Sequence, residues 1–353
     1  MFLESFPVTF PETYLKGMIM TIKDIARLAG VSVSTVSRVL NNHPDVSEDA
    51  IKKVMAVVQK YNYIPNTSAR NLGMSSSDNI GLVVRGISNP FYTKIITAIG
   101  DKIEKSGYTM VMQQITTDED ELRIAAMMEK DKRLQGLILL GGHLNHTKEQ
   151  VASINVPFVC CTFSNVYGNL DNGQYSSVCI DDEENAFNAV KELYKKGHKK
   201  IAVLLSDVDD GTVSQVRYAG YRRALREFGI SDDDNLIIPI HSFNIADAYH
   251  EMSNWLKKGI DFSALFCISD NMAMGAMKAL REAGKRVPDD VAVIAIDGIE
   301  ASEYTNPVLS TFCQPMEQIG IKAVDVLVDI IDNEGTHKHL TLPTTLREGE
   351  TLK

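Results

Sequence analysis

Two kinds of hydrophobic spacing follow one another along the chain. In residues 20–65 the apolar side chains recur every three or four positions, which predicts short amphipathic helices. From Asn79 onward, short apolar runs such as IGLVV and LQGLILLG alternate with longer helical patterns, and the alternation resumes after a break near Asp181. That order is typical of βαβ units with parallel sheets. The pattern predicts a small all-α helix-turn-helix domain followed by a two-lobed α/β domain.

The first segment has helix-ending and helix-capping residues at the positions that a helix-turn-helix requires. Gly30 follows the last periodic residue of MTIKDIARLAG, where a left-handed glycine can end a helix. Ser32 is a candidate N-cap for a second helix, and Ser47 for a third. Each helix has one apolar stripe, comprising Ile22, Ile25, Ala26 and Ala29, then Val36, Val39 and Leu40, then Ile51, Val54, Met55 and Val58. Two short helices joined by a tight glycine turn favour DNA binding.

On the second helix the polar side opposes the apolar stripe. Val33, Ser34, Ser37 and Arg38 are expected to point outward, where their size allows close approach to base edges. Arg38 can form two hydrogen bonds to a guanine or bind a phosphate, and Thr35 and Ser37 can donate hydrogen bonds to phosphate oxygens. This helix is therefore the candidate recognition helix.

Charge is distributed in a way that suits this interpretation. The 353 residues carry a formal net charge of −10, which alone argues against a nucleic-acid partner. Residues 20–72 nevertheless have a local balance of +3, whereas residues 73–353 carry −12. A mildly basic segment on an acidic body allows local contact with DNA and limits non-specific binding by the rest.

Several other classes of protein lack their sequence signals. No apolar run approaches the roughly 18–20 residues of a membrane span, and residues 1–19 do not resemble a secretory signal, so a cytoplasmic location is expected. The five cysteines lie in apolar runs without zinc spacing and are interpreted as buried hydrophobic residues. Glycine-rich phosphate loops are absent, and His143 and His146 are interpreted as surface residues. Neither an enzyme, a cofactor nor a metal site is expected.

The first segment closely resembles the DNA-binding domain of the lactose-repressor (LacI/GalR) family. The similarity covers TIKDIARLAGVSVSTVSRVLNNHPDVSEDAIKKVMAVVQKYNYIPNTSARNL, including the AGVS-x-x-TVSRVLN core. It implies that Val33, Ser34 and Arg38 contact bases in the major groove, and that Leu72 wedges into the minor groove. The complete set of DNA contacts that we expect is Thr21, Val33, Ser34, Thr35, Ser37, Arg38, Asn66, Ala69, Arg70 and Leu72.

The resemblance also implies a hinge helix from Asn66 to about Gly73. Gly73 and residues 75–77 depart from the family, because many members have Lys or Arg there, and phosphate contact at these positions is expected to be weaker. Residues 1–19 fit no part of the family. They are expected to be disordered or an artefact of an upstream start.

The body resembles the effector domain of the same family, whose fold is that of sugar-binding periplasmic proteins. The similarity rests on ISNPFY, GHKKIAVL, RYAGYRRAL, SDNMAMGAMKALREAGKRVPDDVAVIAIDG and PVLSTFCQP. Ligands of open α/β sheets bind outside the carboxyl ends of the strands, so a site between the lobes is expected. The candidate effector residues are Arg85, Phe91, Arg217, Phe243, Ser269, Asp270, Asp297 and Met316.

Each candidate has an expected role. Arg217 and the carboxylates would bond sugar hydroxyls, Phe243 would stack on the ligand, and Phe91 and Met316 would close the cleft from the first lobe. Arg85 departs from the family, since many members have a proline and an acid in this stretch. An arginine there leads to the hypothesis of an anionic effector, such as a phosphorylated sugar or a sugar acid.

The expected domains are the extension 1–19, the helix-turn-helix domain 20–65, the hinge 66–78 and the effector-binding and dimerisation domain 79–353. Lobe 1 is expected to comprise about 79–181 and 313–335, and lobe 2 about 182–310 and 336–353. The resulting hypothesis is a repressor that binds a near-palindromic operator as a homodimer and responds allosterically to a sugar or sugar derivative. A transport binding protein and an enzyme are the rival classes. A family member whose co-regulator is a phosphoprotein is the narrower alternative.

Overall fold

The computed structural model describes residues 20–352, except 41–42, 62, 64–76 and 118. It divides into two compact units, Met1–Ser75 and Ser76–Lys353. The expected contacts Asn66, Ala69, Arg70 and Leu72 and the hinge helix around them lie outside the described residues.

Three helices, α1 (Ile22–Ala29), α2 (Val33–Leu40) and α3 (Glu48–Lys60), surround the small core of the first unit. Gly30 ends α1 in the left-handed conformation (φ 66°, ψ 33°), as predicted. Ser47 caps α3 by accepting a hydrogen bond from the Ala50 backbone N–H, also as predicted. The core contains one to three residues of each predicted stripe, among them Ile25, Val36 and Val54.

The third predicted stripe is wrong in part. Val54 is fully buried, but Ile51 and Met55 are 39% and 38% exposed. The helices α1 and α2 are only eight residues long, so together they cover a narrow face of α3. The residue pattern of α3 alone could not show how much of its apolar side α1 and α2 would cover.

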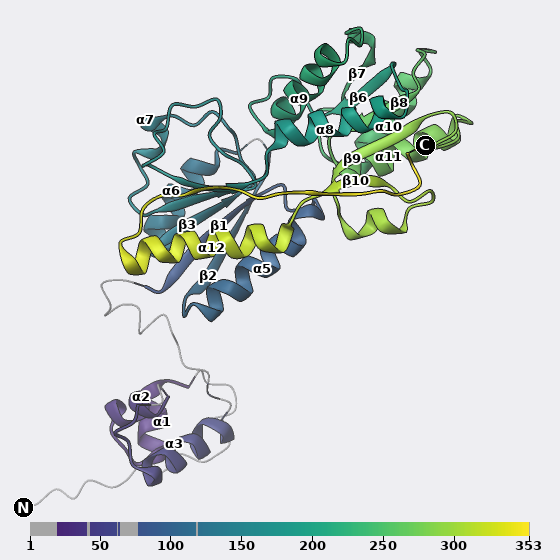
Figure 1. Ribbon diagram of the computed structural model, residues 1–353. Coiled ribbons are helices and arrows are strands. Elements are labelled where there is room, and N and C mark those ends of the chain that lie inside the picture. The colour runs from purple at the N-terminus through teal and green to yellow at the C-terminus, as the bar shows by residue number, and fades with distance from the viewer. Residues whose placement is uncertain (1–19, 41–42, 62, 64–76, 118, 353) are drawn as a thin grey trace, which may run out of the picture. The chain divides into compact units, whose positions relative to one another are not determined.

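The second unit consists of two lobes, each built on a six-stranded sheet (Figure 1). In lobe 1 the strand order is β11-β5-β4-β3-β1-β2, with all neighbours parallel. Its strands are β1 (Asn79–Arg85), β2 (Thr109–Ile115), β3 (Gly136–Leu140), β4 (Phe158–Cys161), β5 (Ser176–Cys179) and β11 (His339–Thr341). The helices around it are α5 (Phe91–Lys105), α6 (Glu121–Lys132), α7 (Lys148–Val151) and α12 (Met316–Asn333).

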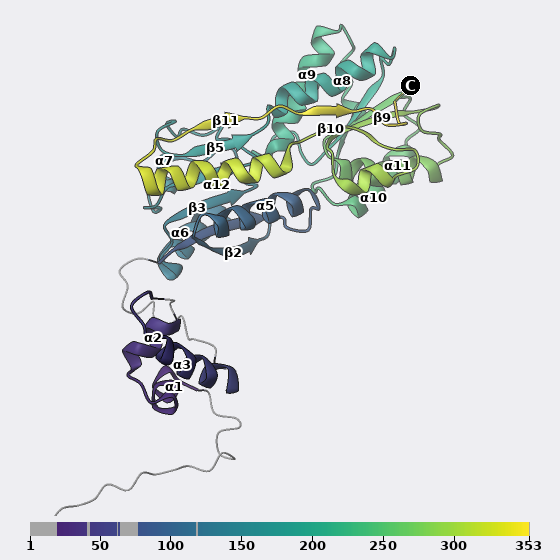
Figure 2. The same cartoon turned by 60° about the horizontal axis from the view of Figure 1, so that its bottom comes forward.

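In lobe 2 the strand order is β12-β10-β9-β8-β6-β7, and only β12 runs antiparallel to its neighbour. Its strands are β6 (Ile201–Leu205), β7 (Ile237–Pro239), β8 (Ala264–Cys267), β9 (Ala292–Asp297), β10 (Ser310–Cys313) and β12 (Thr345–Arg347). The helices are α8 (Asp182–Lys195), α9 (Val213–Glu227), α10 (Ile245–Leu256) and α11 (Asp270–Glu282), with short 3₁₀ turns η2 (Asp234–Leu236) and η3 (Glu300–Tyr304). The α8–α9 and α10–α11 pairs cover opposite faces of this sheet (Figure 2).

Strand periodicity explains the layering of lobe 1. Cys160 and Cys161 are adjacent on β4, and they lie in different hydrophobic clusters on the two faces of the sheet. Cys161 packs in the cluster that contains α5 and α12, whereas Cys160 packs in the cluster that contains α6. Successive side chains of a strand point to opposite faces, as expected for this pair. All five cysteines are free.

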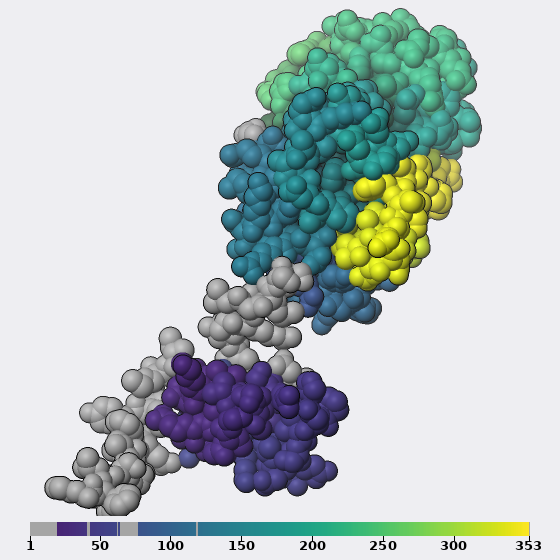
Figure 3. All heavy atoms as spheres, turned by 90° about the vertical axis from the view of Figure 1, so that its left-hand side faces the viewer, coloured from purple at the N-terminus to yellow at the C-terminus, as the bar shows by residue number. Residues whose placement is uncertain are grey.

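The chain passes between the lobes three times, after β5, after β10 and after β11. The last passage differs from the expected boundary, because residues 336–353 were expected to belong to lobe 2. Strand β11 instead pairs with β5 in lobe 1, from His339 opposite Ser177 to Thr341 opposite Cys179 (Figure 2). Short edge strands carry little periodicity of their own, so the sequence did not reveal the partner of β11. The C-terminal segment forms part of the outer surface of this unit (Figure 3).

Within the described ranges, no helix combines the length and the apolar composition that crossing a membrane requires.

Candidate functional site

The outward side of α2 has the arrangement expected of a recognition helix. Val33, Ser34 and Arg38 are exposed, whereas Val36 and Val39 are buried against the rest of the three-helix unit. Ser32 Oγ lies 2.7 Å from Ser34 Oγ and accepts from the Thr35 backbone N–H at 3.1 Å, so hydroxyl groups gather at the start of the helix. A helix N-terminus lined with hydroxyls is suited to phosphate. Ser37 is half-buried on the same helix.

Thr21 has a structural role at the start of α1. It forms a capping box in which its Oγ1 accepts from the Asp24 backbone N–H, while the Thr21 backbone N–H donates to Asp24 Oδ2 at 3.1 Å. The Thr21 hydroxyl also lies 2.6 Å from Asp24 Oδ2. Its expected contact with DNA therefore has to coexist with the cap.

A cavity of about 550 Å³ lies between the two lobes, within the size range of roughly 300–1,000 Å³ usual for small-molecule sites. It is lined from both lobes, mostly by residues that follow the carboxyl ends of strands. Five of the eight expected effector residues line it, namely Arg85, Phe91, Arg217, Phe243 and Asp297.

Arg217 and Asp297 form the polar floor on the lobe 2 side. The Arg217 side chain donates to Asp182 at 2.8 Å and to the Ile268 carbonyl, and its Nη1 lies 3.5 Å from Asp297 Oδ1. Gln314 Nε2 donates to the same Asp297 oxygen at 2.9 Å. Burial raises the pKa of Asp297 to about 7, although Arg217 opposes the shift. This carboxyl group therefore titrates near neutral pH.

The backbone at Asp297 is also unusual, with φ at 142°, a conformation that L residues rarely adopt. The residue is almost fully buried and lines the cavity. Strained backbone of this kind is typical of ligand sites, where the surrounding structure fixes it.

Ser269, Asp270 and Met316 are not among the described residues that line the cavity, which departs from their expected roles. Ser269 caps α11 by accepting from the Met272 backbone N–H. Asp270 is fully buried and accepts from Ser302, Thr311 and the backbone N–H groups of residues 298 and 299. Met316 packs in the hydrophobic core. Position at a strand end was not sufficient, because the Asp270 carboxylate already accepts from these hydroxyl and backbone donors.

Arg85 lies in the lobe 1 wall, but its charge is already neutralised. Nη1 is 2.7 Å from Glu121 Oε2 and 2.9 Å from the Glu119 carbonyl, and Nη2 donates to the Thr117 carbonyl. Both partners of the ion pair are buried, at 9% and 1% exposure. The hypothesis that Arg85 selects an anionic effector loses its physical basis, since the guanidinium has a carboxylate beside it.

Glu121 also organises both histidines of the following loop. It accepts from the His143 backbone N–H at 2.6 Å and lies 3.2 Å from His143 Nδ1 and 3.3 Å from His146 Nε2. The prediction that these histidines lie on the surface is wrong, because His146 is 3% exposed and His143 lines the cavity. Their partner is 22 or more residues away in sequence, and local spacing gave no signal of it.

Other cavity residues were missed. Several of them stand just after the end of a strand and could have been found by the same rule that selected Asp297. They include Thr116, Thr162, Ser206, Asp207, His241 and Gln314. Asp210 and Asn244 also line the cavity from loops of lobe 2, and Tyr92 lines it from α5 beside Phe91, with ring centroids 5.3 Å apart.

Comparison with known proteins agrees with this architecture. Residues 21–66 match the family described as bacterial regulatory proteins, lacI family, and residues 190–352 match the periplasmic binding protein-like domain. The HTH-type transcriptional regulator MalR of Clostridium butyricum is 41% identical over 331 residues, covering 93% of this chain and 98% of the relative. The chain belongs to the lacI family.

Solved structures of the Lac repressor and of the transcriptional regulator CelR have the same fold. The Lac repressor dimer bound to operator and the anti-inducer ONPF superposes with a TM-score of 0.76 at 26% identity, covering 95% of this chain and 99% of that chain. The complex of the transcriptional regulator CelR with cellobiose gives 0.69 at 28% identity, covering 94% and 99%. As a lacI-family member, this protein is a transcriptional regulator with a DNA-binding helix-turn-helix domain and a two-lobed effector domain.

Proposed function

We propose that this protein represses transcription by binding a near-palindromic operator as a homodimer, and that an uncharged sugar in the interlobe cavity controls its affinity for DNA. The observation that carries the proposal is the cavity itself, where Arg217, Asp297 and Gln314 present a connected set of donors and acceptors. Such sets bond pairs of sugar hydroxyls well. The cellobiose complex of the related CelR supports this class of ligand.

Charge favours a neutral ligand over an anionic one. Both cavity arginines are paired, Arg85 with Glu121 and Arg217 with Asp182 and Asp297. The lobe 2 wall adds Asp207, beside His241 at 3.0 Å, and Asp210, whose described bonds are to Thr212. An anion would be repelled by these carboxylates, whereas hydroxyl groups can donate to them.

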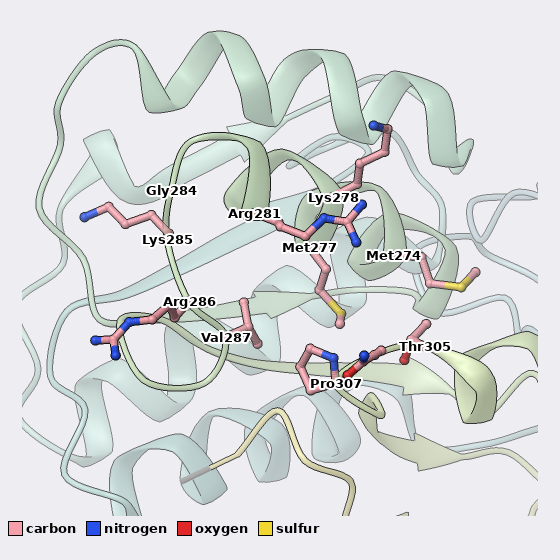
Figure 4. A pocket seen from close by; sticks show the side chains of 11 residues that line it. Met274, Met277, Lys278, Arg281, Gly284, Lys285, Arg286, Val287, Thr305 and Pro307 are labelled. Carbon is pink, nitrogen blue, oxygen red and sulfur yellow. The ribbon is translucent and has the colours of Figure 1, made fainter.

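The homodimer is proposed to form partly through lobe 2. A groove of about 570 Å³ lies between α11 with the loop that follows it and the loop after η3, with Met274, Met277 and Pro307 in its lining (Figure 4). Tyr304, just before the loop, is 80% exposed. The rim carries cations such as Arg281, and η3 carries Glu300, so charges of both signs are available to pair across a two-fold contact. The related Lac repressor binds its operator as a dimer, which supports a dimeric state.

Regulation follows from linkage between the two functions. An effector that contacts both lobes favours the relative orientation of the lobes in which it binds more tightly. Operator binding that depends on this orientation is then coupled to effector binding, and each ligand changes the affinity for the other by the same coupling free energy. Residues 66–78 are proposed to be the hinge that connects the DNA-binding domain to the effector domain.

A thermal-shift screen tests the proposal with neutral mono- and disaccharides, sugar phosphates, sugar acids and nucleobases. A neutral sugar should raise the melting temperature, by an amount equivalent to about 2.7 kcal/mol at a hundredfold excess over its Kd. The same sugar should then change the affinity for a duplex selected by the protein from a random library. If sugar phosphates alone stabilise the protein, the neutral-effector proposal is wrong. If only a phosphoprotein fraction alters DNA binding, the co-regulator alternative is correct.

A further inference from the structure

The side chain of Arg38 is held by an acid from outside the recognition helix. Its Nη1 lies 3.1 Å from Asp45 Oδ2, in the segment between α2 and α3. The other carboxylate oxygen, Asp45 Oδ1, lies 2.6 Å from His43 Nδ1. All three side chains are more than half exposed.

Residues 43–47, which include Asp45, are fixed at both ends. The His43 backbone N–H donates to the Arg38 carbonyl at 3.0 Å, which ties the segment to the last turn of α2. Two residues beyond Asp45, Ser47 caps α3. The carboxylate thus has a defined position beside the recognition helix.

An exposed ion pair contributes little to folding stability, so stability alone does not account for the arrangement. Its effect on recognition is larger, because a long arginine side chain loses rotamer freedom when it contacts a base. A guanidinium has five N–H donors, and it can bond Asp45 and a guanine edge at the same time. Pairing with Asp45 restricts the side chain before DNA arrives.

We propose that Asp45 is a specificity-determining residue of the DNA interface, which positions Arg38 for base contact and at the same time weakens binding to arbitrary sequences. The second effect follows from its charge, since a carboxylate beside the recognition helix is repelled by phosphates. This inference rests on the proposed function, because it requires Arg38 to contact a base.

The ionisation of Asp45 agrees with both roles. Desolvation is the largest single influence on Asp45 and raises its pKa, but the hydrogen bond from His43 and the charge of Arg38 act together with smaller contributions to lower the pKa below its ordinary value. The group is therefore a carboxylate at neutral pH, as positioning and repulsion both require.

The test measures discrimination by the full-length protein on a duplex that the parent protein selects from a random library. Dissociation constants are compared for the selected duplex, for all its single-base-pair variants and for an unrelated duplex of the same length. In Asp45→Asn we expect discrimination at one base pair of each half-site to fall about fivefold or more, while binding to the unrelated duplex becomes tighter. Arg38→Ala should lose discrimination at the same base pair.

Asp49→Asn is the matched control. Asp49 is an exposed acid of the same domain, and it pairs with Lys53 at 2.6 Å rather than with Arg38. Its neutralisation removes the same charge, so we expect tighter binding to the unrelated duplex without a change in discrimination. Thermal unfolding of each variant checks that its DNA-binding domain is folded.

The double variant Arg38→Ala/Asp45→Asn separates positioning from a general structural effect. We expect it to discriminate no worse than Arg38→Ala alone, because Asp45 acts through Arg38. Additive losses would overturn the proposal, as would full discrimination by Asp45→Asn. If Arg38→Ala discriminates like the parent, Arg38 is not a base contact and the inference fails while the regulator function stands. If the parent selects no sequence, the proposed function itself fails.

Discussion

Arg85 Nη1 lies 2.7 Å from Glu121 Oε2 in the wall of the effector cavity, and the two side chains are almost completely buried. A buried ion pair is costly to break from one side, because the remaining charge loses its partner in a medium that solvates it poorly. Glu121 is also the acceptor for the loop that contains His143. The pair therefore connects the stability of lobe 1 with the shape of the ligand site.

The first prediction concerns this carboxylate. Glu121→Gln should lower the free energy of unfolding of the effector domain by about 3–5 kcal/mol, because Arg85 keeps its charge without an ionised partner. Urea unfolding monitored by circular dichroism measures the change. Glu104→Gln, an exposed position on α5, is the control and should stay within about 0.5 kcal/mol of the parent. An equally small effect at Glu121 would contradict the importance of the pair.

The same residue predicts acid sensitivity. Burial raises the pKa of Glu121, but hydrogen bonds from His143 and His146 outweigh it and hold the pKa well below its ordinary value of 4.5. A depressed folded pKa contributes stability that is complete above about pH 4.5 and is lost as the pH falls below it. Glu121→Gln should show less acid-dependent loss than the parent when melting temperatures are compared between pH 3 and 6, a range chosen to span roughly that value.

Asp297 predicts the opposite slope in a higher pH range. Burial raises its pKa from 3.8 to about 7, so between these values the folded protein binds more protons than the unfolded chain. Its contribution to the free energy of unfolding therefore falls as the pH rises through this window. Asp297→Asn should remove that component, visible as a flatter profile of unfolding free energy against pH. An unchanged slope would show that the carboxyl group titrates normally.

Two glycines at the cavity provide a matched pair. Gly141 and Gly86 both have positive φ, at 70° and 73°, but an added Cβ at Gly141 would lie 2.5 Å from the Tyr92 hydroxyl, whereas an added Cβ at Gly86 would have no described heavy atom within 4 Å beyond its own chain neighbours. Gly86→Ala should cost only the backbone conformation, about 1–2 kcal/mol. Gly141→Ala should cost more and also move Tyr92 in the cavity. Chemical denaturation of both variants and their response to the sugar found by thermal shift measure the difference.

The dimer proposal predicts a change in oligomeric state. Tyr304→Asp places a charge in the proposed interface and should shift the protein toward monomer in analytical ultracentrifugation, with weaker operator binding because the two DNA-binding domains no longer act together. Val166→Asp, at an apolar position that is 59% exposed in lobe 1, is the control and should remain dimeric. A dimeric Tyr304→Asp would place the interface elsewhere.

Local chemistry explains why much of this molecule could be predicted. Gly30 and Ser47 act within a few residues of their own positions, so their roles as helix terminator and cap were visible in the sequence. The same holds for the exposed Arg38 and for the strand-end position of Asp297, which follows from the topology of parallel sheets.

Non-local partners explain what could not be predicted. Asp270 and Asp297 both lie near strand ends. Only the fold shows that the Asp270 carboxylate accepts hydrogen bonds from the buried hydroxyls of Ser302 and Thr311. Glu121 lies in a helical segment with no local sign that it would meet Arg85, 36 residues earlier. Such pairings depend on how distant elements pack, which residue periodicity does not encode.

The three passages of the chain between lobes 1 and 2 restrict how these lobes can move. A single tether would permit translation and twisting in any direction, whereas three neighbouring tethers resist sliding and leave mainly rotation about one axis. A ligand that fixes this one angle therefore fixes most of the orientation of one lobe relative to the other. Since the tethers are independent lengths of backbone, cutting one of them would leave two that still define the axis.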